Sequence, residues 1–145
     1  MLSTASIQAG RGTAMTAASR VRVLIIDPDR RVRGGLSDLL TTETDLVICA
    51  TAGSPRTALA CISAQQPDVA LLDVLLPGPA QGLGLLRKLH TLGLPVVVLT
   101  TAASLRDQAQ QSGAAAFLEK DDNLDLIPQA LRAAAQTNPK GPRQH

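Results

Sequence analysis

The stretch Pro67-Asp-Val-Ala-Leu-Leu-Asp73-Val-Leu-Leu-Pro77-Gly78 decides how the rest of this chain is arranged. Its apolar run, residues 69–72, lies between a proline and a proline–glycine pair, which is the pattern of a short buried strand. The carboxylate of Asp73 follows that strand directly. Ligands of open parallel sheets bind outside the carboxyl ends of the strands. Asp73 is therefore the first candidate for a functional residue.

Strand-like and helix-like segments alternate on both sides of this stretch. We expect strands at 21–26, 46–52, 69–72, 95–99 and 115–118, and helices at 30–42, from 55 onward, around 83–92, at 104–112 and at 122–136. Most of the strands are continuously apolar, which indicates burial on both faces. Alternation with helices requires parallel pairing and right-handed crossovers. The predicted fold is a doubly wound α/β three-layer sandwich of the flavodoxin-like type, with five parallel strands in the order 2-1-3-4-5.

Length and composition indicate one domain with tails. The chain has 145 residues, of which 45% are hydrophobic and 1% aromatic, so the core is aliphatic. We expect a disordered leader at 1–19, the domain at 20–137 and a flexible tail at 138–145. No apolar run reaches the roughly eighteen residues of a membrane span, and the N-terminus lacks the apolar block of a signal peptide. Cys49 and Cys61 are expected to be buried reduced thiols of a cytoplasmic protein.

The charge of the expected domain differs in sign from that of the whole chain. The chain carries a net charge of +2, but all 12 acidic residues and only 10 of the 14 basic residues lie within 21–136, which makes that segment −2. A negatively charged domain argues against direct nucleic-acid binding.

Four of the five predicted strands end in a functional group: Asp27, Asp73, Thr100 and Lys120. In the predicted strand order, the first and third strands are neighbours, so the two aspartates lie side by side. Two close carboxylates repel unless a cation lies between them, and a hard divalent cation such as Mg²⁺ prefers oxygen ligands. A carboxylate, a metal ion, a hydroxyl and an ammonium together form a phosphoryl-transfer site.

These residues carry a resemblance to a known family. The matching pieces are Val-Leu-Ile-Ile-Asp27, the stretch 67–78, Val-Val-Val-Leu-Thr100 and Gly113-Ala-Ala-Ala-Phe117-Leu-Glu-Lys120. The chain resembles the CheY-like receiver domain of two-component response regulators over about 21–136. The resemblance implies that Asp73 accepts a phosphoryl group from a histidine kinase or a phosphotransfer protein. It also implies Mg²⁺ held by Asp27, Asp73 and the backbone carbonyl of Leu75, phosphoryl contacts from Thr100 and Lys120, and a switch made by Thr100 and Phe117.

The resemblance also sets expectations about partners. Phosphorylation would change the face formed by the fourth helix, the fifth strand and the fifth helix, for a partner or for a homodimer. The pattern Val-Arg-Gly-Gly-Leu at 32–36 is similar to regulators with a C-terminal helix-turn-helix (LuxR/NarL-like), so two alternatives stay open: the protein acts alone through partners, or it is the receiver portion of a longer regulator whose output domain binds DNA. Self-phosphorylation and self-dephosphorylation are the only enzymatic activities expected.

The chain departs from the family pattern at three places. Pro28 stands where a second acid usually follows Asp27, and Asp29 is either a helix N-cap or a further metal ligand. The loop after Pro77 is one residue longer than usual and lacks an aspartate. Leu75 is apolar and is expected to align hydrolytic water poorly, so that the phosphoryl group is long-lived.

Two alternative functions stay open at this point. Pro28 supports a pseudo-receiver, which binds partners without phosphorylation. Asp27-Pro-Asp29 also resembles the nucleophile motif of haloacid-dehalogenase-like phosphohydrolases, with Asp27 as nucleophile and Asp29 as general acid, but that alternative leaves Asp73 unexplained. Arg30, Arg31 and Arg33 are expected either to face solvent or to help dock a partner.

Overall fold

The computed structural model describes residues 20–139, in which five parallel strands form one sheet. The leader predicted for 1–19 and most of the predicted tail lie outside these described residues. The strands are β2 (Val21–Ile26), β3 (Leu46–Ala52), β4 (Val69–Leu72), β5 (Val96–Thr100) and β6 (Ala116–Glu119). Their order across the sheet is β3-β2-β4-β5-β6, which confirms the predicted order.

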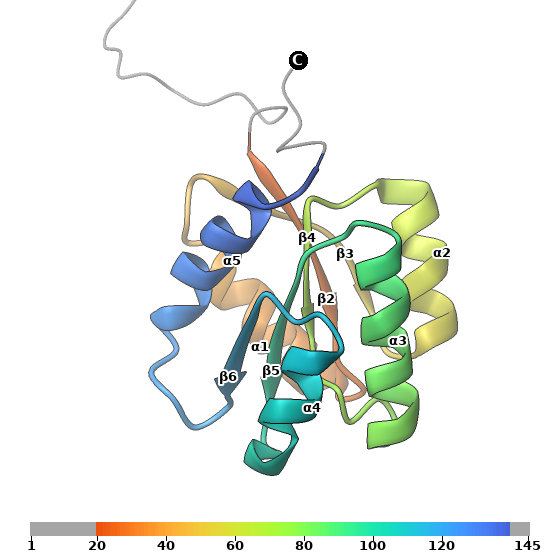
Figure 1. The fold of residues 1–145 in the computed structure, drawn as a ribbon. Helices are drawn as coiled ribbons and strands as arrows, with labels where there is room; N and C mark the ends of the chain where they lie inside the picture. The colour runs from red at the N-terminus through yellow and green to blue at the C-terminus, as the bar shows by residue number, and fades with distance from the viewer. Residues whose placement is uncertain (1–19, 140–145) are drawn as a thin grey trace, which may run out of the picture.

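The helices cover both faces of this sheet (Figure 1). They are α1 (Arg30–Leu40), α2 (Pro55–Gln65), α3 (Pro79–Thr91), the 3-10 turn η2 (Ala103–Leu105), α4 (Arg106–Gln111) and α5 (Leu126–Gln136). Helices α1 and α5 pack on one face, and α2, α3 and α4 pack on the other. The doubly wound three-layer architecture expected from the sequence is therefore confirmed.

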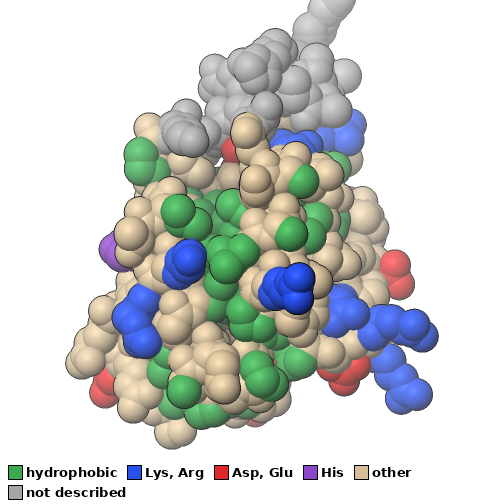
Figure 2. All heavy atoms as spheres, turned by 90° about the vertical axis from the view of Figure 1, so that its right-hand side faces the viewer, with side chains coloured by type: hydrophobic (Ala, Val, Ile, Leu, Met, Phe, Trp, Pro, Cys, Tyr) green, Lys and Arg blue, Asp and Glu red, His purple; other side chains and the backbone are tan. Residues whose placement is uncertain are grey.

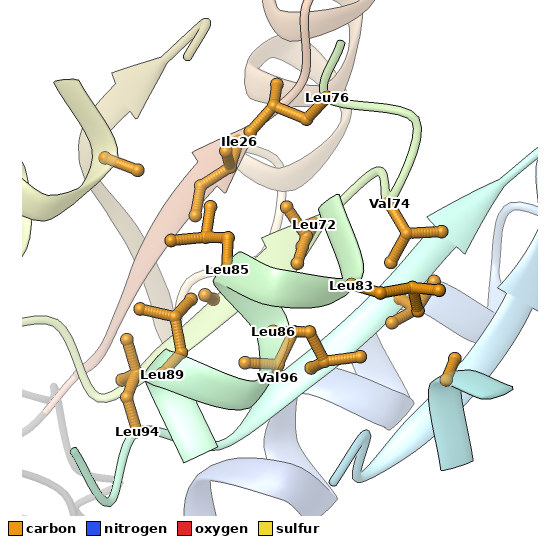
Figure 3. Packing of buried hydrophobic residues seen from close by; sticks show 14 of the residues in the cluster. Ile26, Leu72, Val74, Leu76, Leu83, Leu85, Leu86, Leu89, Leu94 and Val96 are labelled. Carbon is orange, nitrogen blue, oxygen red and sulfur yellow. The ribbon is translucent and has the colours of Figure 1, made fainter. Parts of the chain in front are cut away.

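Alternate residues of each central strand enter opposite halves of the core. On β2, Leu24 and Ile26 face the layer of α3, whereas Val23 and Ile25 face α1 and α5, and all four are fully buried. Figure 3 shows leucines of α3 packed against the sheet. Burial of one leucine contributes about 1.5–3 kcal/mol, whereas a glycine costs a helix about 1 kcal/mol. Packing therefore maintains α3 despite the two glycines that it contains.

Three helix boundaries differ from the prediction for local reasons. Helix α1 ends at Leu40 rather than Thr42, because the hydroxyls of Thr41 and Thr42 donate to carbonyl oxygens of the last turn. Helix α3 begins at Pro79, since proline suits the first helical position, where an N–H has no helical partner. Helix α5 begins only at Leu126, because side chains of the preceding segment accept hydrogen bonds within turns.

The surface shows where the aliphatic core reaches solvent. On the face formed by α2 and α3, hydrophobic side chains are visible between lysine and arginine side chains (Figure 2).

Cys49 and Cys61 are free thiols, as expected, but both are half-buried rather than fully buried. Partial burial raises the pKa of the Cys49 thiol above its ordinary value. No helix within residues 20–139 has the length and apolar character needed to cross a membrane.

Candidate functional site

The carboxyl edge of the sheet brings the four predicted functional side chains together. Asp27 and Asp73 follow β2 and β4, which pair directly with each other. Thr100 ends β5, and Lys120 follows β6. The side chains of Asp27, Asp73 and Thr100 are almost completely buried, with 2%, 5% and 0% of their residue surface exposed. Because isolated buried charges are strongly unfavourable, these two carboxylates need compensating cations and hydrogen-bond donors.

Lys120 supplies one cation to both carboxylates. Its Nζ lies 2.8 Å from Oδ2 of Asp27 and 2.9 Å from Oδ2 of Asp73. Partial burial alone would lower the pKa of Lys120, but its hydrogen bonds to Asp27 and Asp73 outweigh that effect and raise the pKa above the ordinary value. The ammonium is therefore protonated at neutral pH and links the ends of three strands.

Two further donors converge on the other oxygen of Asp73. The hydroxyl of Thr100 donates to Oδ1 of Asp73 over 2.8 Å, and the backbone amide of Leu75 donates to the same atom over 2.9 Å. Both oxygens of Asp73 therefore accept hydrogen bonds. This carboxylate lies among a hydroxyl, an amide and an ammonium, which are the groups that neutralise a phosphoryl oxygen.

Asp27 and Asp29 have different roles after β2. Oδ1 of Asp27 accepts a hydrogen bond from the amide of Asp29, at 2.9 Å. The carboxylate of Asp29 is the N-cap of α1 and accepts a hydrogen bond from the amide of Arg31, at 2.8 Å. The N-cap interpretation of Asp29 is confirmed. Pro28 is exposed between the two, so the edge carries one acid at this point where the resembled family carries two.

A glycine of α3 positions the segment that follows Asp73. A Cβ atom at Gly82 would lie 1.5 Å from the carbonyl oxygen of Val74. Only glycine allows the helix to approach the backbone this closely. The sequence contained this glycine, but nothing in its pattern indicated which backbone it would contact. Gly82 therefore fixes the path of the loop that carries Leu75.

Arg33 belongs to the edge of the site, which the sequence did not indicate. Its guanidinium donates to the backbone carbonyl of Asp27 over 2.7 Å and is half-buried, whereas Arg30 and Arg31 are exposed as expected for a solvated face. The one available signal was its position, six residues after Asp27 and one helical turn after the N-cap. That spacing allows a long side chain on α1 to reach back to the end of β2.

Phe117 lies inward, and Arg106 covers it. The phenylalanine is only 6% exposed, and the guanidinium carbon of Arg106 lies 4.7 Å from the ring centroid, within the range of a cation–π interaction. Arg106 also forms an ion pair with Glu119 at 3.6 Å. Phe117 is therefore part of the core, and α4 contacts β6 through Arg106.

The donor set at the edge fits a hard divalent cation. Residues 20–139 contain no cluster of three or more acidic, histidine or cysteine side chains that could hold a metal ion. The edge instead offers two carboxylates and the carbonyl of Leu75, to which no described residue donates a hydrogen bond. Within the described residues, each Oδ2 of the aspartates accepts a hydrogen bond from Lys120 and retains capacity for another partner. Oxygen ligands of this kind, completed by water, suit Mg²⁺.

Comparisons with known proteins agree on one family. The family model described as the response regulator receiver domain matches residues 23–132. A solved signal receiver domain of the response regulator NarL from Mycobacterium tuberculosis is 31% identical, with a TM-score of 0.72 over 81% of this chain and 98% of that chain. The DNA-binding transcriptional activator DevR/DosR of Mycobacterium tuberculosis is 37% identical over 107 residues, which are 70% of this chain and 48% of the relative.

Other relatives carry different activities. The protein-glutamate methylesterase/protein-glutamine glutaminase 3 of Burkholderia lata is 29% identical over 136 residues, which are 84% of this chain but 37% of the relative. The chain therefore spans about a third to a half of the curated relatives that it matches. What it shares with the regulators and the methylesterases alike is the receiver domain. With the parallel sheet, the four edge residues and the match over 23–132, the chain belongs to the receiver-domain family of two-component response regulators.

Proposed function

We propose that Asp73 accepts a phosphoryl group from a histidine kinase or a phosphotransfer protein, with Mg²⁺ bound at the same edge. The observation that carries this proposal is the convergence of three donors on one buried carboxylate. Asp73 accepts hydrogen bonds from Thr100, Leu75 and Lys120, at 2.8–2.9 Å. These groups neutralise negative charge without any rearrangement of the chain, which is the main contribution of a protein to phosphoryl transfer.

The transfer forms one bond and breaks another. A carboxylate oxygen of Asp73 attacks the phosphorus atom, so that a new P–O bond forms while the P–N bond to the donor histidine breaks. The imidazole nitrogen retains the electron pair of the broken bond and takes up a proton. Lys120 and Thr100 then contact phosphoryl oxygens in place of carboxylate oxygens. Mg²⁺, when bound, supplies the positive charge that balances those oxygens.

Asp27, Asp73 and the carbonyl of Leu75 are the ligands that we propose for this metal ion. Asp29 is the weaker candidate, since its carboxylate already caps α1. With one acid fewer than the usual pattern, water would complete the coordination on the side of Pro28. The metal site would therefore be weaker than one with two acids after the first strand.

Signalling would follow from the positions of Thr100 and Phe117. In this structure Thr100 already contacts Asp73, and Phe117 already lies inward. Phosphorylation would therefore stabilise an arrangement that the chain can adopt by itself, as in a population shift. The affected face includes α4, β6 and α5. Leu124 and Leu126 leave 46% and 41% of their surface exposed near the start of α5, which suits a protein partner or a second copy of the chain.

The output would lie outside this chain. Relatives include DNA-binding regulators, and the segment 21–136 is itself negatively charged, so DNA binding would belong to a separate output domain. The free thiols of Cys49 and Cys61 suit the reducing cytoplasm, where we place the phosphotransfer reaction.

Intact-protein mass spectrometry after incubation with acetyl phosphate and Mg²⁺ tests the proposal. A gain of about 80 Da, one phosphoryl group, is expected for the wild-type protein and is expected to be absent in Asp73→Asn. Asp27→Asn should reduce the gain sharply. A gain that persists in Asp73→Asn and vanishes in Asp27→Asn would instead support the phosphohydrolase alternative.

One observation favours a second candidate, the pseudo-receiver. Lys120 already bridges both carboxylates, and Pro28 removes one acid, so the edge is partly neutralised without a metal ion or a phosphoryl group. In that case the folded protein would show no mass gain with any small phosphodonor. Pro28→Asp would then be the variant in which phosphorylation should return.

A further inference from the structure

Arg33 and Gly53 form a matched pair beside the candidate metal site. The guanidinium Nη1 of Arg33 donates to the carbonyl oxygen of Asp27 over 2.7 Å. A Cβ atom at Gly53 would lie 2.7 Å from the same Nη1 and 3.4 Å from Cζ. Real Cβ atoms essentially never approach another atom to 2.7 Å, so the absence of a side chain at Gly53 provides the space for the guanidinium.

The hydrogen-bond pattern of the sheet explains why the guanidinium binds there. The amide of Asp27 donates to Ala52 on β3 over 3.0 Å, while the carbonyl of Ile26 accepts from Asp73 on the other side. The carbonyl of Asp27 therefore points toward β3 at the point where the ladder ends. Arg33 provides the donor that the ladder no longer supplies, and this fixes a permanent positive charge at the carboxyl edge.

The charges of Asp27, Asp73 and Lys120 are balanced only when Arg33 is included. Asp27 and Asp73 contribute two negative charges at 2% and 5% exposure. Lys120 contributes one positive charge, and Arg33 contributes the second. Pro28 stands where another acid would have made the edge negative. These four side chains therefore sum to zero charge before any divalent cation binds, while the remaining acid of the edge, Asp29, is exposed to water.

We propose that Arg33 is a built-in counter-cation that weakens the binding of divalent cations at the Asp27–Asp73 pair. The inference rests on the metal site proposed above and deepens it. A cation held at the backbone carbonyl of Asp27 repels a second cation that approaches the carboxylate of the same residue, and water screens this repulsion less than on the open surface because the carboxylates are buried and Arg33 is half-buried. Occupancy by Mg²⁺, and with it phosphorylation, would then respond to Mg²⁺ concentration instead of being saturated.

A purely structural role for Arg33 makes a different prediction. If the guanidinium only satisfies the carbonyl of Asp27, its removal lowers the stability of the fold and either leaves metal affinity unchanged or weakens it. If it acts as a counter-cation, its removal raises metal affinity. The two roles therefore differ in the sign of the effect on metal binding.

Isothermal titration calorimetry with Mg²⁺, and separately with Mn²⁺, measures that sign without an optical probe, which suits a chain with one phenylalanine and no tyrosine or tryptophan. For Arg33→Gln we expect the dissociation constant to fall by roughly three- to thirtyfold in low salt, and the difference to shrink as ionic strength rises. Arg33→Lys retains the charge and should bind the metal about as weakly as the wild type.

Two variants separate charge at this position from charge elsewhere. In Gly53→Ala the new methyl group displaces the flexible end of Arg33 while every charge is kept, so metal affinity should rise part of the way toward that of Arg33→Gln. Arg56→Gln removes the same charge from an exposed residue of α2 and should change the dissociation constant by less than about twofold.

The outcomes distinguish this inference from the site on which it rests. Binding by the wild type that is lost in Asp27→Asn, with tighter binding by Arg33→Gln, supports both. Equal or weaker binding by Arg33→Gln and Gly53→Ala overturns the counter-cation role and leaves the metal site standing. If neither the wild type nor Arg33→Gln binds either metal ion in a manner that depends on Asp27, the metal site and the inference are both wrong.

Discussion

The hydroxyl of Thr100 donates a hydrogen bond of 2.8 Å to Oδ1 of Asp73 in the interior of the protein. Thr100 is fully buried, and its oxygen also accepts a hydrogen bond from the amide of Ala102 at 3.3 Å. The hydroxyl thus acts as donor and acceptor at once. Because Asp73 follows β4 and Thr100 ends β5, this bond joins the ends of two neighbouring strands beyond their backbone ladder.

Replacement of Thr100 by valine tests that connection, since valine keeps the shape and removes the hydroxyl. The variant leaves the amide of Ala102 without its partner and Asp73 with one donor fewer. We expect the free energy of unfolding to fall by about 1–3 kcal/mol in urea titrations followed by circular dichroism. Thr101→Val is the control, because Thr101 is exposed, and it should change stability by less than about 0.5 kcal/mol. Equal stability of the two variants would contradict the role of the bond.

Loss of Lys120 should have a larger effect, with a defined pH dependence. Lys120→Met leaves the carboxylates of Asp27 and Asp73 without their shared cation, and we expect a loss of roughly 2–4 kcal/mol at pH 7, since Lys120 is itself 21% exposed. The pKa of Lys120 is raised in the folded state. Its contribution to the free energy of unfolding is therefore complete below pH 10.5, the ordinary pKa of lysine, and is lost as pH rises through the pKa of the folded protein. On the alkaline side, the difference in free energy of unfolding between wild type and variant should therefore begin to narrow only above pH 10.5.

Added Mg²⁺ provides the control for this variant. A divalent cation at the two carboxylates would replace part of the missing positive charge, so Mg²⁺ should raise the melting temperature of Lys120→Met more than that of the wild type. A variant that is as stable as the wild type at pH 7, with or without Mg²⁺, would show that the bridging ammonium has no net stabilising effect.

The strand ends were predictable because their pattern is local. Each functional residue directly follows an apolar run, and the rules for parallel sheets place those runs at one edge, so Asp27, Asp73, Thr100 and Lys120 were found before any contact was known. The helices were predicted with less accurate ends, since the side chains of Thr41, Asp122 and Asn123 form hydrogen bonds that compete with the helical pattern.

Contacts that depend on three-dimensional approach were not predictable. Arg33 was grouped with its exposed neighbours, because a charge run on a helix does not reveal which side chain returns to the strand. Gly82 has no pattern in the sequence that indicates its contact. Its function depends on the distance to Val74, which only the folded chain defines. Both residues contact backbone carbonyl groups. A contact with the backbone does not require a particular residue type at the other position, so a single sequence shows no pattern that reveals it.

The two glycines of α3 allow a matched test of close approach. Gly82→Ala would place a methyl group 1.5 Å from the carbonyl oxygen of Val74, so the helix or the loop must move. We expect a loss of about 2–4 kcal/mol in the free energy of unfolding. Gly84→Ala meets nothing nearer than 3.8 Å and should instead stabilise the helix by up to about 1 kcal/mol. Effects of the same sign would show that helix propensity, rather than the contact with Val74, governs both positions.

Arg132 of α5 makes a separate electrostatic contact with the segment before β3. Its Nε lies 2.6 Å from Oδ2 of Asp45, and its guanidinium also binds Glu43. The hydrogen bond from Arg132 lowers the pKa of Asp45 below the ordinary value of 3.8. Arg132→Met should cost about 0.5–1 kcal/mol at neutral pH, since the pair is partly solvated.

The pH dependence of that cost follows from the sign of the shift. The pKa of the Asp45 carboxyl group is lowered in the folded state. Its contribution to the free energy of unfolding is therefore complete above pH 3.8, its ordinary pKa, and is lost as pH falls through the pKa of the folded protein. Urea titrations of wild type and Arg132→Met should therefore differ by a constant amount from pH 5 upward and converge below pH 3.8. Arg87→Met on α3 is a suitable control, and a difference that persists unchanged in acid would contradict the assignment.

We expect Leu75 to govern the lifetime of the proposed phosphoryl group. Its amide fixes Asp73, and its half-buried side chain offers no group that could orient a water molecule for attack on phosphorus. We expect the phosphorylated protein to persist for minutes or longer, and Leu75→Asn, which adds an amide at the same point, to shorten the half-life by roughly tenfold. The decay of the phosphorylated mass after removal of acetyl phosphate measures both values, with Leu75→Met as the apolar control. Because both variants keep the backbone amide at position 75, a half-life of seconds in the wild type would show that water reaches the phosphorus without help from this side chain.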